Sequence, residues 1–444
     1  MKRVLTALFL LALTVTTSLP LSGAGPQKAK RVLPQILGET NKSALSYQAG
    51  EEMVYTFKAS FDSVVPGKWF LQYVRKGDDG KTFSGQVPAG QVLTVKTSLD
   101  RPGFVSVNVT LTDEKGKPVL LPDEKGTEKK IQYFAGTAVH PEKLSDCGEP
   151  AGFDAFWEKQ KKRLAEVPFQ GKVERKLIRT TPLGTLYEVT IPAPGPRPAT
   201  GYLNIPPDAK AKSLPAMIRF YGYGTRRQPY PGWIPAGYIT LFLNAHGQKM
   251  GQPDEYYKKF FDSIRTPKYG YAFDPEQNKD PENCFFNGMV MRLLRGLEYL
   301  KTLPEWDGKN LCAYGSSQGG LQAVWAGALD PDVTEVSSAV TWCCDLAGNT
   351  KAKRLCGSWR VPYVPELDLY DPVFMAKRIR KADVTILRAG LGDYTCPPSG
   401  LMILYKNLAT PKKTIRWVQG SNHGFVPKKS EVVVWSTKKD PGKK

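Results

Sequence analysis

One serine of this chain lies in a sequence context that is typical of a nucleophile. Residues 311–320 read Leu-Cys-Ala-Tyr-Gly-Ser-Ser-Gln-Gly-Gly, which places the pattern G-x-S-x-G between an apolar segment and a helical one. In such an elbow the chain turns so sharply that Ser317 exposes its hydroxyl, and side chains at Gly315 and Gly319 would collide. Ser316 occupies the variable position and is expected to point away. A purely structural turn is the alternative, but the strand and helix around the pattern favour a nucleophile.

The scarcity of histidine narrows the choice of a base for that serine. A serine hydroxyl needs an imidazole base held by a carboxylate, and around this elbow the chain order is serine, acid, histidine. The chain has three histidines, His140, His246 and His423. Only His423 follows Ser317, so we predict that His423 is the base.

The acid is expected at the carboxyl end of a strand between the serine and the histidine. Asp393 follows an apolar segment at 384–389, and Asp345 and Asp371 are the competing candidates. Asp371 precedes a proline and has the pattern of a helix cap, whereas Asp345 fits a role in structuring its loop. We therefore predict that Asp393 orients the histidine and stabilises the imidazolium.

The negative charge that develops on an ester carbonyl needs hydrogen-bond donors already in place. The backbone N–H of Gln318, at the start of the expected helix, is one candidate. The second is expected from the loop at 219–225, Arg-Phe-Tyr-Gly-Tyr-Gly-Thr, where glycines allow close approach of the backbone and Tyr223 is our choice of donor. The alternative for this loop is a glycine-rich turn with aromatic residues in the core.

The elements around these residues alternate between apolar strands and amphipathic helices. Such alternation predicts an α/β domain with a mostly parallel sheet and helices on both faces. The expected strands lie at 216–221, 239–244, 309–314, 336–342, 384–389 and 414–418, and the expected helices at 288–302, 318–329, 372–380 and 399–408. Residues 249–286 are rich in aromatics without a clear period, and such an insertion lines a site or a subunit contact, or packs on its own domain.

The N-terminal part of the chain has a different pattern. Short strands separated by turn residues between about 47 and 137 predict a small immunoglobulin-like β-sandwich, acting as an interaction or spacer module rather than a sugar-binding domain. The first residues are basic, then apolar, then small, as in a signal peptide cleaved after Ala24, with a retained anchoring helix as the alternative. The predicted divisions are 1–24 signal peptide, 25–45 polar tether, 46–138 β-sandwich domain, 139–150 linker, 151–430 α/β-hydrolase catalytic domain and 431–444 basic tail.

The composition excludes several classes of protein. Of 444 residues, 41% are hydrophobic and 23% charged, which excludes wholesale disorder. No apolar run of about 18 residues follows the first two dozen, which argues against a membrane-spanning body. The net charge of +20 is spread along the chain without an arginine-rich element, so it indicates a basic surface that attracts acidic polysaccharide rather than nucleic acid. The seven cysteines show no metal-binding spacing, and no cofactor is expected.

Several short motifs, taken in order, resemble the acetyl xylan esterase and cephalosporin C deacetylase family, carbohydrate esterase family seven. The resemblance covers roughly residues 145–430 and implies an α/β-hydrolase that removes acetyl groups from small sugar esters. It implies Ser317, Asp393 and His423 as a triad and Tyr223 and Gln318 as oxyanion donors. The matching motifs are the Phe156-Trp157 helix, Tyr221-Gly222-Tyr223-Gly224, Gly247-Gln248, residues 315–320, Cys344-Asp345, and Gly392-Asp393 with Cys396-Pro397-Pro398.

Three departures from the family pattern stand out. The family's Arg-Gly-Gln reads His246-Gly247-Gln248, so the arginine that would brace that loop is absent, and the family's His-Glu reads His423-Gly424. The N-terminal sandwich lies outside the family's core. We expect His246 and Gln248 to support the loop, with direct contact to substrate as the alternative.

The function predicted from these residues is that of a secreted or periplasmic serine carboxylesterase that acts on acetylated carbohydrate. The alternatives are an esterase for bulkier acyl or glycan esters, a peptidase of the prolyl oligopeptidase type, and a non-catalytic glycan-binding protein on a decayed esterase domain. The resemblance also implies that the aromatic insertion serves contacts in a homo-oligomer.

Overall fold

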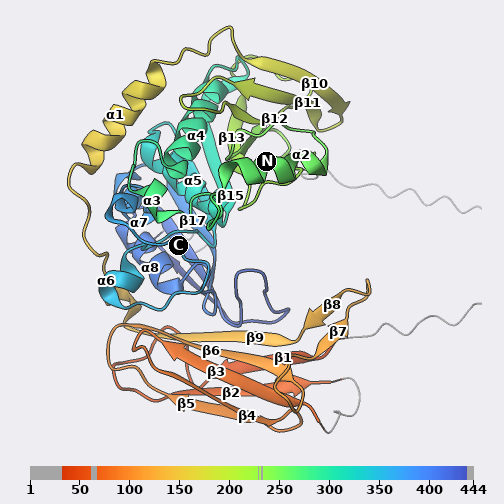
Figure 1. The fold of residues 1–444 in the computed structure, drawn as a ribbon, viewed down its shortest axis with the longest axis vertical. Helices are drawn as coiled ribbons and strands as arrows, with labels where there is room; N and C mark the ends of the chain where they lie inside the picture. Colours follow the sequence, from red (N-terminus) through yellow and green to blue (C-terminus); the bar gives the residue numbers. More distant parts are fainter. Residues whose placement is uncertain (1–32, 62–67, 229, 232–233, 438–444) are drawn as a thin grey trace, which may run out of the picture.

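The structure is a computed structural model that describes residues 33–61, 68–228, 230–231 and 234–437 (Figure 1). The predicted signal peptide lies outside the described residues, as do the first part of the predicted tether, residues 25–32, and the end of the predicted tail. Within the described ranges, no helix has both the length and the apolar character needed to cross a membrane.

Two antiparallel sheets form the N-terminal part of the molecule. Their strand orders are β1-β2-β5 and β4-β3-β6-β9, with a small hairpin of β7 and β8 beside them. One apolar core lies between the sheets and includes Tyr55, Phe57, Val107 and Tyr133. The strands are β1 (Gln35–Thr40), β2 (Met53–Ser60), β3 (Phe70–Gly77), β4 (Thr82–Pro88), β5 (Leu93–Thr97), β6 (Gly103–Thr112), β7 (Leu120–Pro122), β8 (Glu128–Lys130) and β9 (Gln132–Val139).

Strand β1 differs from the sequence-based prediction, which placed this segment in a polar tether. It pairs antiparallel with β2 along its whole length. Ile36 is buried while Leu37 is 46% exposed, so the strand contributes little to the core and its alternation is weak in sequence. The pairing comes from backbone hydrogen bonds at a sheet edge, which leave little hydrophobic signal.

A ten-stranded mixed sheet forms the hydrolase part of the chain, with the order β10-β11-β12-β14-β13-β15-β16-β17-β18-β19. The six strands from β14 to β18 in this order are parallel, and the pairs at both edges are antiparallel. The prediction of a mostly parallel sheet therefore holds for the centre and not for the edges. The strands are β10 (Glu174–Thr181), β11 (Gly184–Ile191), β12 (Ala199–Ile205), β13 (Leu214–Phe220), β14 (Ile239–Asn244), β15 (Trp306–Ser316), β16 (Glu335–Ala339), β17 (Asp383–Gly390), β18 (Lys413–Val418) and β19 (Val432–Ser436).

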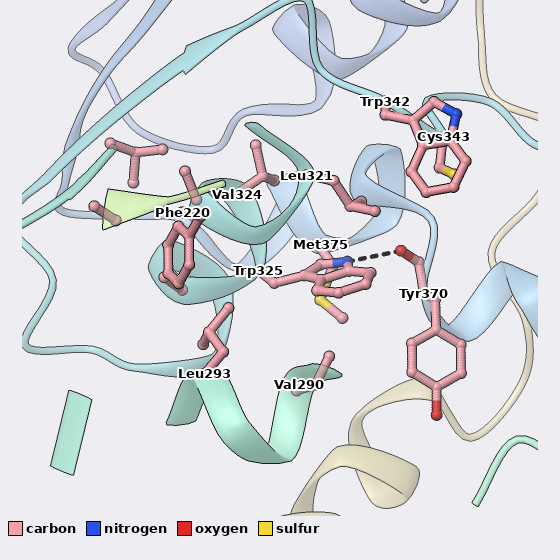
Figure 2. Packing of buried hydrophobic residues seen from close by; sticks show 14 of the residues in the cluster. Phe220, Val290, Leu293, Leu321, Val324, Trp325, Trp342, Cys343, Tyr370 and Met375 are labelled. Carbon is pink, nitrogen blue, oxygen red and sulfur yellow. Dashed lines mark hydrogen bonds between the residues drawn. The ribbon is translucent and has the colours of Figure 1, made fainter. Parts of the chain in front are cut away.

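Helices α4 and α5 pack against this sheet, and α5 contacts β13, β15 and β16. Figure 2 shows Phe220, Leu293, Val324 and Trp325 meeting in the core, where the indole N–H of Trp325 donates to the backbone oxygen of Tyr370 at 2.8 Å. The helix that begins beside Ser317 is therefore fixed by packing and by a buried hydrogen bond. The helices are α1 (Phe153–Ala165), α2 (Asp254–Ile264), α3 (Pro275–Asn278), α4 (Phe285–Lys301), α5 (Gln318–Leu329), α6 (Gly348–Ala352), α7 (Pro372–Met375) and α8 (Pro398–Asn407).

Two segments of the hydrolase part are more ordered than their sequences indicate. Helix α2 lies inside the aromatic stretch for which no period was found. Strand β19 lies inside the predicted basic tail and pairs antiparallel with β18. It is an edge strand whose alternate residues Val432 and Val434 are exposed. Because it has no strong buried stripe and lies between lysine-rich segments, its sequence gives only a weak strand signal.

The N-terminal sheets lie at one end of the hydrolase part, next to the blue C-terminal segments of the chain (Figure 1). Phe104 of β6 and Trp417 of β18 are both fully buried, and their ring centroids are 5.8 Å apart. Burial of two large aromatic side chains against each other stabilises the contact between the two parts. The two parts therefore share a packed interface close to the last strands of the hydrolase sheet.

Candidate active site

Ser317 lies at the sharp turn between β15 and α5, as the sequence pattern predicts. Its backbone angles are φ 59° and ψ −122°, a conformation that non-glycine residues rarely adopt. A side chain at Gly315 would come within 2.2 Å of the Gly319 carbonyl, and one at Gly319 within 2.5 Å of the Phe220 oxygen. Both glycines are therefore required for the two strands and the helix to approach each other at the elbow.

Local backbone hydrogen bonds hold the strained residue in place. The N–H of Ser317 donates to the Ala339 oxygen at 2.9 Å, and its own oxygen accepts from Leu321 at 3.0 Å and Trp342 at 3.2 Å. The neighbouring Ser316 is exposed and is not the serine that faces the histidine.

The structure brings Ser317, His423 and Asp393 into one hydrogen-bonded chain. The distance from Ser317 Oγ to His423 Nε2 is 3.1 Å, and that from His423 Nδ1 to Asp393 Oδ2 is also 3.1 Å. A carboxylate only accepts, so the ring's Nδ1 carries the hydrogen and Nε2 is free to accept from the serine hydroxyl. This is the arrangement in which a serine is activated for attack.

Asp393 is fully buried and is held by the loop that follows β17. Its Oδ1 accepts from the N–H groups of Thr395 and Cys396, each at 3.0 Å. These bonds leave Oδ2 directed at the histidine. The two competing acids lie elsewhere: Asp371 caps α7 through the Val373 N–H, which confirms its predicted capping role, and Asp345 pairs with Arg354.

His423 lies in a compact turn after β18. The side chain of Asn422 accepts from the N–H groups of Gly424 and Phe425 at 3.0 and 2.8 Å. Arg388 on β17 donates to the His423 oxygen at 2.9 Å. The imidazole is 30% exposed, so it is accessible to substrate while Asp393 behind it is not.

The two predicted oxyanion donors are connected through Tyr271. The backbone N–H of Gln318 is at the N-terminus of the twelve-residue helix α5, the end of a helix that favours negative charge. The hydroxyl of Tyr271 donates to Gln318 Oε1 at 2.8 Å, and the Tyr223 ring stacks on Tyr271 with centroids 4.1 Å apart. Burial raises the pKa of both tyrosines, so both keep their hydroxyl hydrogens.

This geometry can be compared with known proteins. A family model described as acetyl xylan esterase (AXE1) matches residues 142–354, and a model of the prolyl oligopeptidase family matches residues 288–439. An acetyl esterase, Axe7A, of Xylanibacter ruminicola is 27% identical over 318 residues, which cover 67% of this chain and 70% of the relative.

The chain is a carboxylic ester hydrolase related to the acetyl xylan esterases. The resemblance predicted from the sequence motifs, and the predicted enzyme class, are thereby confirmed.

Two solved structures share the fold of the esterase. The acetyl xylan esterase from Paenibacillus sp. R4 has a TM-score of 0.54 at 22% identity, and acetyl xylan esterase 1 from Thermoanaerobacterium sp. JW/SL YS485 has a TM-score of 0.51 at 23% identity. Each comparison covers 64% of this chain and 92% of the other. The α/β-hydrolase fold of the hydrolase part is thus established, and the N-terminal sheets account for much of the remainder.

A cluster of aromatic side chains includes Trp342, whose backbone N–H donates to the Ser317 oxygen at 3.2 Å. Tyr223 contacts Trp342 and Trp359 edge-on, with centroid distances of 5.6 and 4.8 Å, and Phe273 contacts Trp359 at 5.3 Å. Phe273 belongs to the aromatic stretch at 249–286, so part of that stretch lines the site. Trp359 is 45% exposed, so part of this aromatic cluster is accessible to solvent.

His246 and Gln248 are both buried on the loop after β14 rather than facing the serine. The N–H of His246 donates to Asn244 Oδ1 at 2.8 Å, and its ring packs edge-on against Tyr271 at 4.6 Å. The side chain of Gln248 donates to the Arg226 oxygen at 3.1 Å. These contacts favour loop support over contact with substrate.

Sequence reasoning missed two arginines that hold this loop. Arg197 donates to the His246 oxygen and the fully buried Arg292 donates to the Ala245 oxygen, each at 2.8 Å. Arg197 lies just before β12 and Arg292 lies on α4. The loop that lacks the family's arginine is therefore held by two arginines from distant segments. The signal that could have indicated Arg292 is its position in the largely apolar first half of α4, whereas Arg197 has no comparable signal.

Asp393 and His423 also form, with Cys396, a group whose ligand atoms lie within 4.8 Å of one another. Among the described residues this is the group that offers three donors of metal-binding type. A metal on Nδ1 of His423 would replace the hydrogen bond to Asp393. The geometry therefore favours the hydrogen-bonded triad.

Proposed function

We propose that the esterase is a secreted serine carboxylesterase that removes O-acetyl groups from xylan-type oligosaccharides or other acetylated sugars. The observation that carries the mechanism is the chain of two 3.1 Å hydrogen bonds joining Ser317, His423 and Asp393. The acetyl ester substrate is supported by the names of the related proteins and by the exposed indole of Trp359, on which the apolar face of a sugar ring can pack.

The proposed reaction proceeds through an acyl-enzyme. Ser317 Oγ attacks the carbonyl carbon while His423 Nε2 takes the hydroxyl proton, and Asp393 stabilises the imidazolium. The N–H groups of Gln318 and Tyr223 receive the developing oxyanion. His423 then gives its proton to the departing sugar oxygen, which leaves acetyl on Ser317. A water activated by His423 attacks the acetyl group, and acetate leaves with the serine hydroxyl restored.

Four finer features of the prediction are also proposed. The order of strands β1-β2-β5 and β4-β3-β6-β9 supports an immunoglobulin-like sandwich, because strands A, B and E share one sheet and C, F and G the other in that fold. Helices on both faces of the large sheet, export by cleavage after Ala24 and homo-oligomer formation remain proposals.

The triad is tested by hydrolysis of 4-nitrophenyl acetate by wild type, Ser317→Ala and Ser316→Ala. We expect Ser317→Ala to lower kcat by about 10⁵-fold or more, because loss of the nucleophile removes the covalent route. The matched variant Ser316→Ala alters the exposed neighbour and is expected to retain kcat within about twofold. Comparable activity of the two variants would overturn the assignment of the nucleophile.

The acyl preference is tested by the same enzyme on acetate, butyrate and octanoate esters of 4-nitrophenol. Selectivity for acetate, together with release of acetate from acetylated xylo-oligosaccharides, is expected. A preference for the longer chains would instead favour an esterase for bulkier acyl groups.

A further inference from the structure

Strand β9 of the N-terminal sheets runs beside the loops that carry the proposed acid and base. It is an edge strand of its own sheet, so one side of its backbone lacks a strand partner within that sheet. The Phe134 N–H donates to the Gly420 oxygen at 3.3 Å, and these residues form an isolated antiparallel bridge. At Phe134, the free edge of β9 is therefore hydrogen bonded to the segment that leads into His423.

Gln419 makes this contact specific. Its Oε1 accepts from the Gly136 N–H at 2.9 Å and its Nε2 donates to the Gly136 oxygen at 2.8 Å, although the two residues are 283 positions apart. The side chain is buried, and Oε1 also accepts from the Gly420 N–H at 3.0 Å. A buried amide with both of its polar atoms paired fixes the position of the backbone beside it.

The loop that carries Asp393 approaches strand β9 so closely that glycines are needed where the two backbones meet. A Cβ at Gly136 would lie 2.3 Å from the Leu391 oxygen, and one at Gly392 would lie 2.4 Å from the Phe134 Cβ and oxygen. The two loops also contact each other, because the Gly392 N–H donates to the Ser421 oxygen at 3.0 Å. Strand β9 thus supports both loops, one residue before Asp393 and four residues before His423.

From these contacts we infer that the segment of strand β9 from Phe134 to Gly136 supports the loops of the proposed acid and base, with Gln419 as a positioning residue that aligns His423 and Asp393 through this segment. The inference rests on the proposed function, since it assigns a role relative to that triad. It replaces the predicted role of the N-terminal part as a spacer. Small displacements of catalytic groups lower the rate strongly, by about 10²-fold for a shift of about 1 Å.

The first test replaces the amide in the full-length protein. Gln419→Ala is expected to lower kcat for 4-nitrophenyl acetate about 10- to 100-fold with KM changed less than about threefold, because substrate contacts remain while the alignment of the base is lost. The matched control is Gln132→Ala on the same strand, whose Nε2 donates to Thr110 Oγ1 within its own sheet. This control is expected to retain kcat within about twofold.

The second test inserts a methyl group between strand and acid loop. Gly136→Ala is expected to lower kcat by at least as much as Gln419→Ala, because the new Cβ overlaps Leu391. Gly85→Ala is its control, since a Cβ there would lie 2.8 Å from the Tyr73 ring within the N-terminal sheets and far in sequence from either loop. Thermal denaturation of each variant separates a loss of kcat from a loss of folded protein.

A readout that does not depend on turnover is the low-field proton resonance of the His423 Nδ1–H, bonded to Asp393. It is identified by its absence in His423→Gln and is expected to broaden or shift in Gln419→Ala and Gly136→Ala but not in the two controls. Unchanged kcat together with an unchanged resonance would overturn the inference. A wild-type protein without Ser317-dependent hydrolysis would overturn the proposed function instead, while the resonance would still decide whether β9 aligns the pair.

Discussion

The serine and the histidine of the proposed triad lie 3.1 Å apart, yet two different kinds of structure hold them. Ser317 is fixed by its immediate surroundings: two glycines, the end of β15, the start of α5 and backbone bonds to adjacent strands. His423 and Asp393 lie on loops that pack against β9, a strand of the N-terminal sheets. One half of the site is therefore encoded locally, whereas the other half is completed by a distant segment.

This difference explains why the serine half of the site has a clearer sequence motif than the half that holds the histidine and the acid. A local turn needs particular residues at fixed offsets, so it is visible as a motif. A contact between distant backbones needs only a glycine and an amide, which have no characteristic spacing. The comparison predicts different consequences when each half is altered.

After the loss of the serine itself, the largest effect on kcat is expected from a change of the acid. Asp393→Asn should lower kcat about 10⁴-fold, because the amide favours the wrong tautomer of His423. The control is Asp345→Asn, which removes the pair with Arg354 and is expected to lower stability while keeping kcat close to that of wild type. Steady-state kinetics on 4-nitrophenyl acetate decides between the two acids, and a larger loss of kcat in Asp345→Asn would reverse the assignment.

A smaller effect, on folding rather than chemistry, is expected at the elbow. Gly315→Ala places a Cβ 2.2 Å from the Gly319 carbonyl, where no side-chain rotation relieves the overlap, and should lower the free energy of unfolding by about 3 kcal/mol. Gly222→Ala lies near the same site, but its Cβ meets no atom within 4 Å, so it should be tolerated. The free energy of unfolding of both variants is measured with a denaturant. Equal values for Gly315→Ala and Gly222→Ala would show that the elbow does not depend on the glycine at position 315.

The smallest effect concerns the loop after β14, which combines local and distant supports. Burial, with Arg292 and Arg197 nearby, lowers the pKa of His246 to about 3, whereas an unfolded histidine titrates near 6.5. Between these values the unfolded state binds the extra proton, so the free energy of unfolding falls as the pH is lowered below about 6.5. The slope is about 1.4 kcal/mol per pH unit from this residue.

This slope is measured by urea unfolding at several pH values between 4 and 7. His246→Gln is expected to reduce this slope relative to wild type, because it removes the titrating group. Equal slopes in wild type and His246→Gln would show that His246 is protonated in the folded protein as readily as in the unfolded one.

Much of the hydrolase part could be predicted from sequence because its strands and helices are strongly patterned. Strand β14 and helix α5 have the predicted bounds, 239–244 and 318–329. Strands β10, β11 and β12 were missed. For β10 the reason is that it is an edge strand with mostly exposed residues and no buried stripe. Strands β1 and β19 were assigned to a tether and a tail for the same physical reason.

For the site, the residues that perform chemistry are easier to infer than those that support them. Ser317, Asp393 and His423 follow from motif, chain order and elimination, and the structure brings them together. Gln419 could not be found in this way, because a glutamine gains its role only from the Gly136 backbone that folding places beside it. The same is true of Arg197, whose target is the carbonyl of His246.

The contact between Gly136 and Gln419 also sets an order of events during biosynthesis. The ribosome releases the N-terminal sheets first, and domains generally fold as units while the chain is being made. We therefore expect the N-terminal sheets, including strand β9, to fold before the loop with Gln419 and His423 docks on them. The last loop then docks on an edge that is already formed, and we expect esterase activity to appear only as translation of the chain is nearly complete.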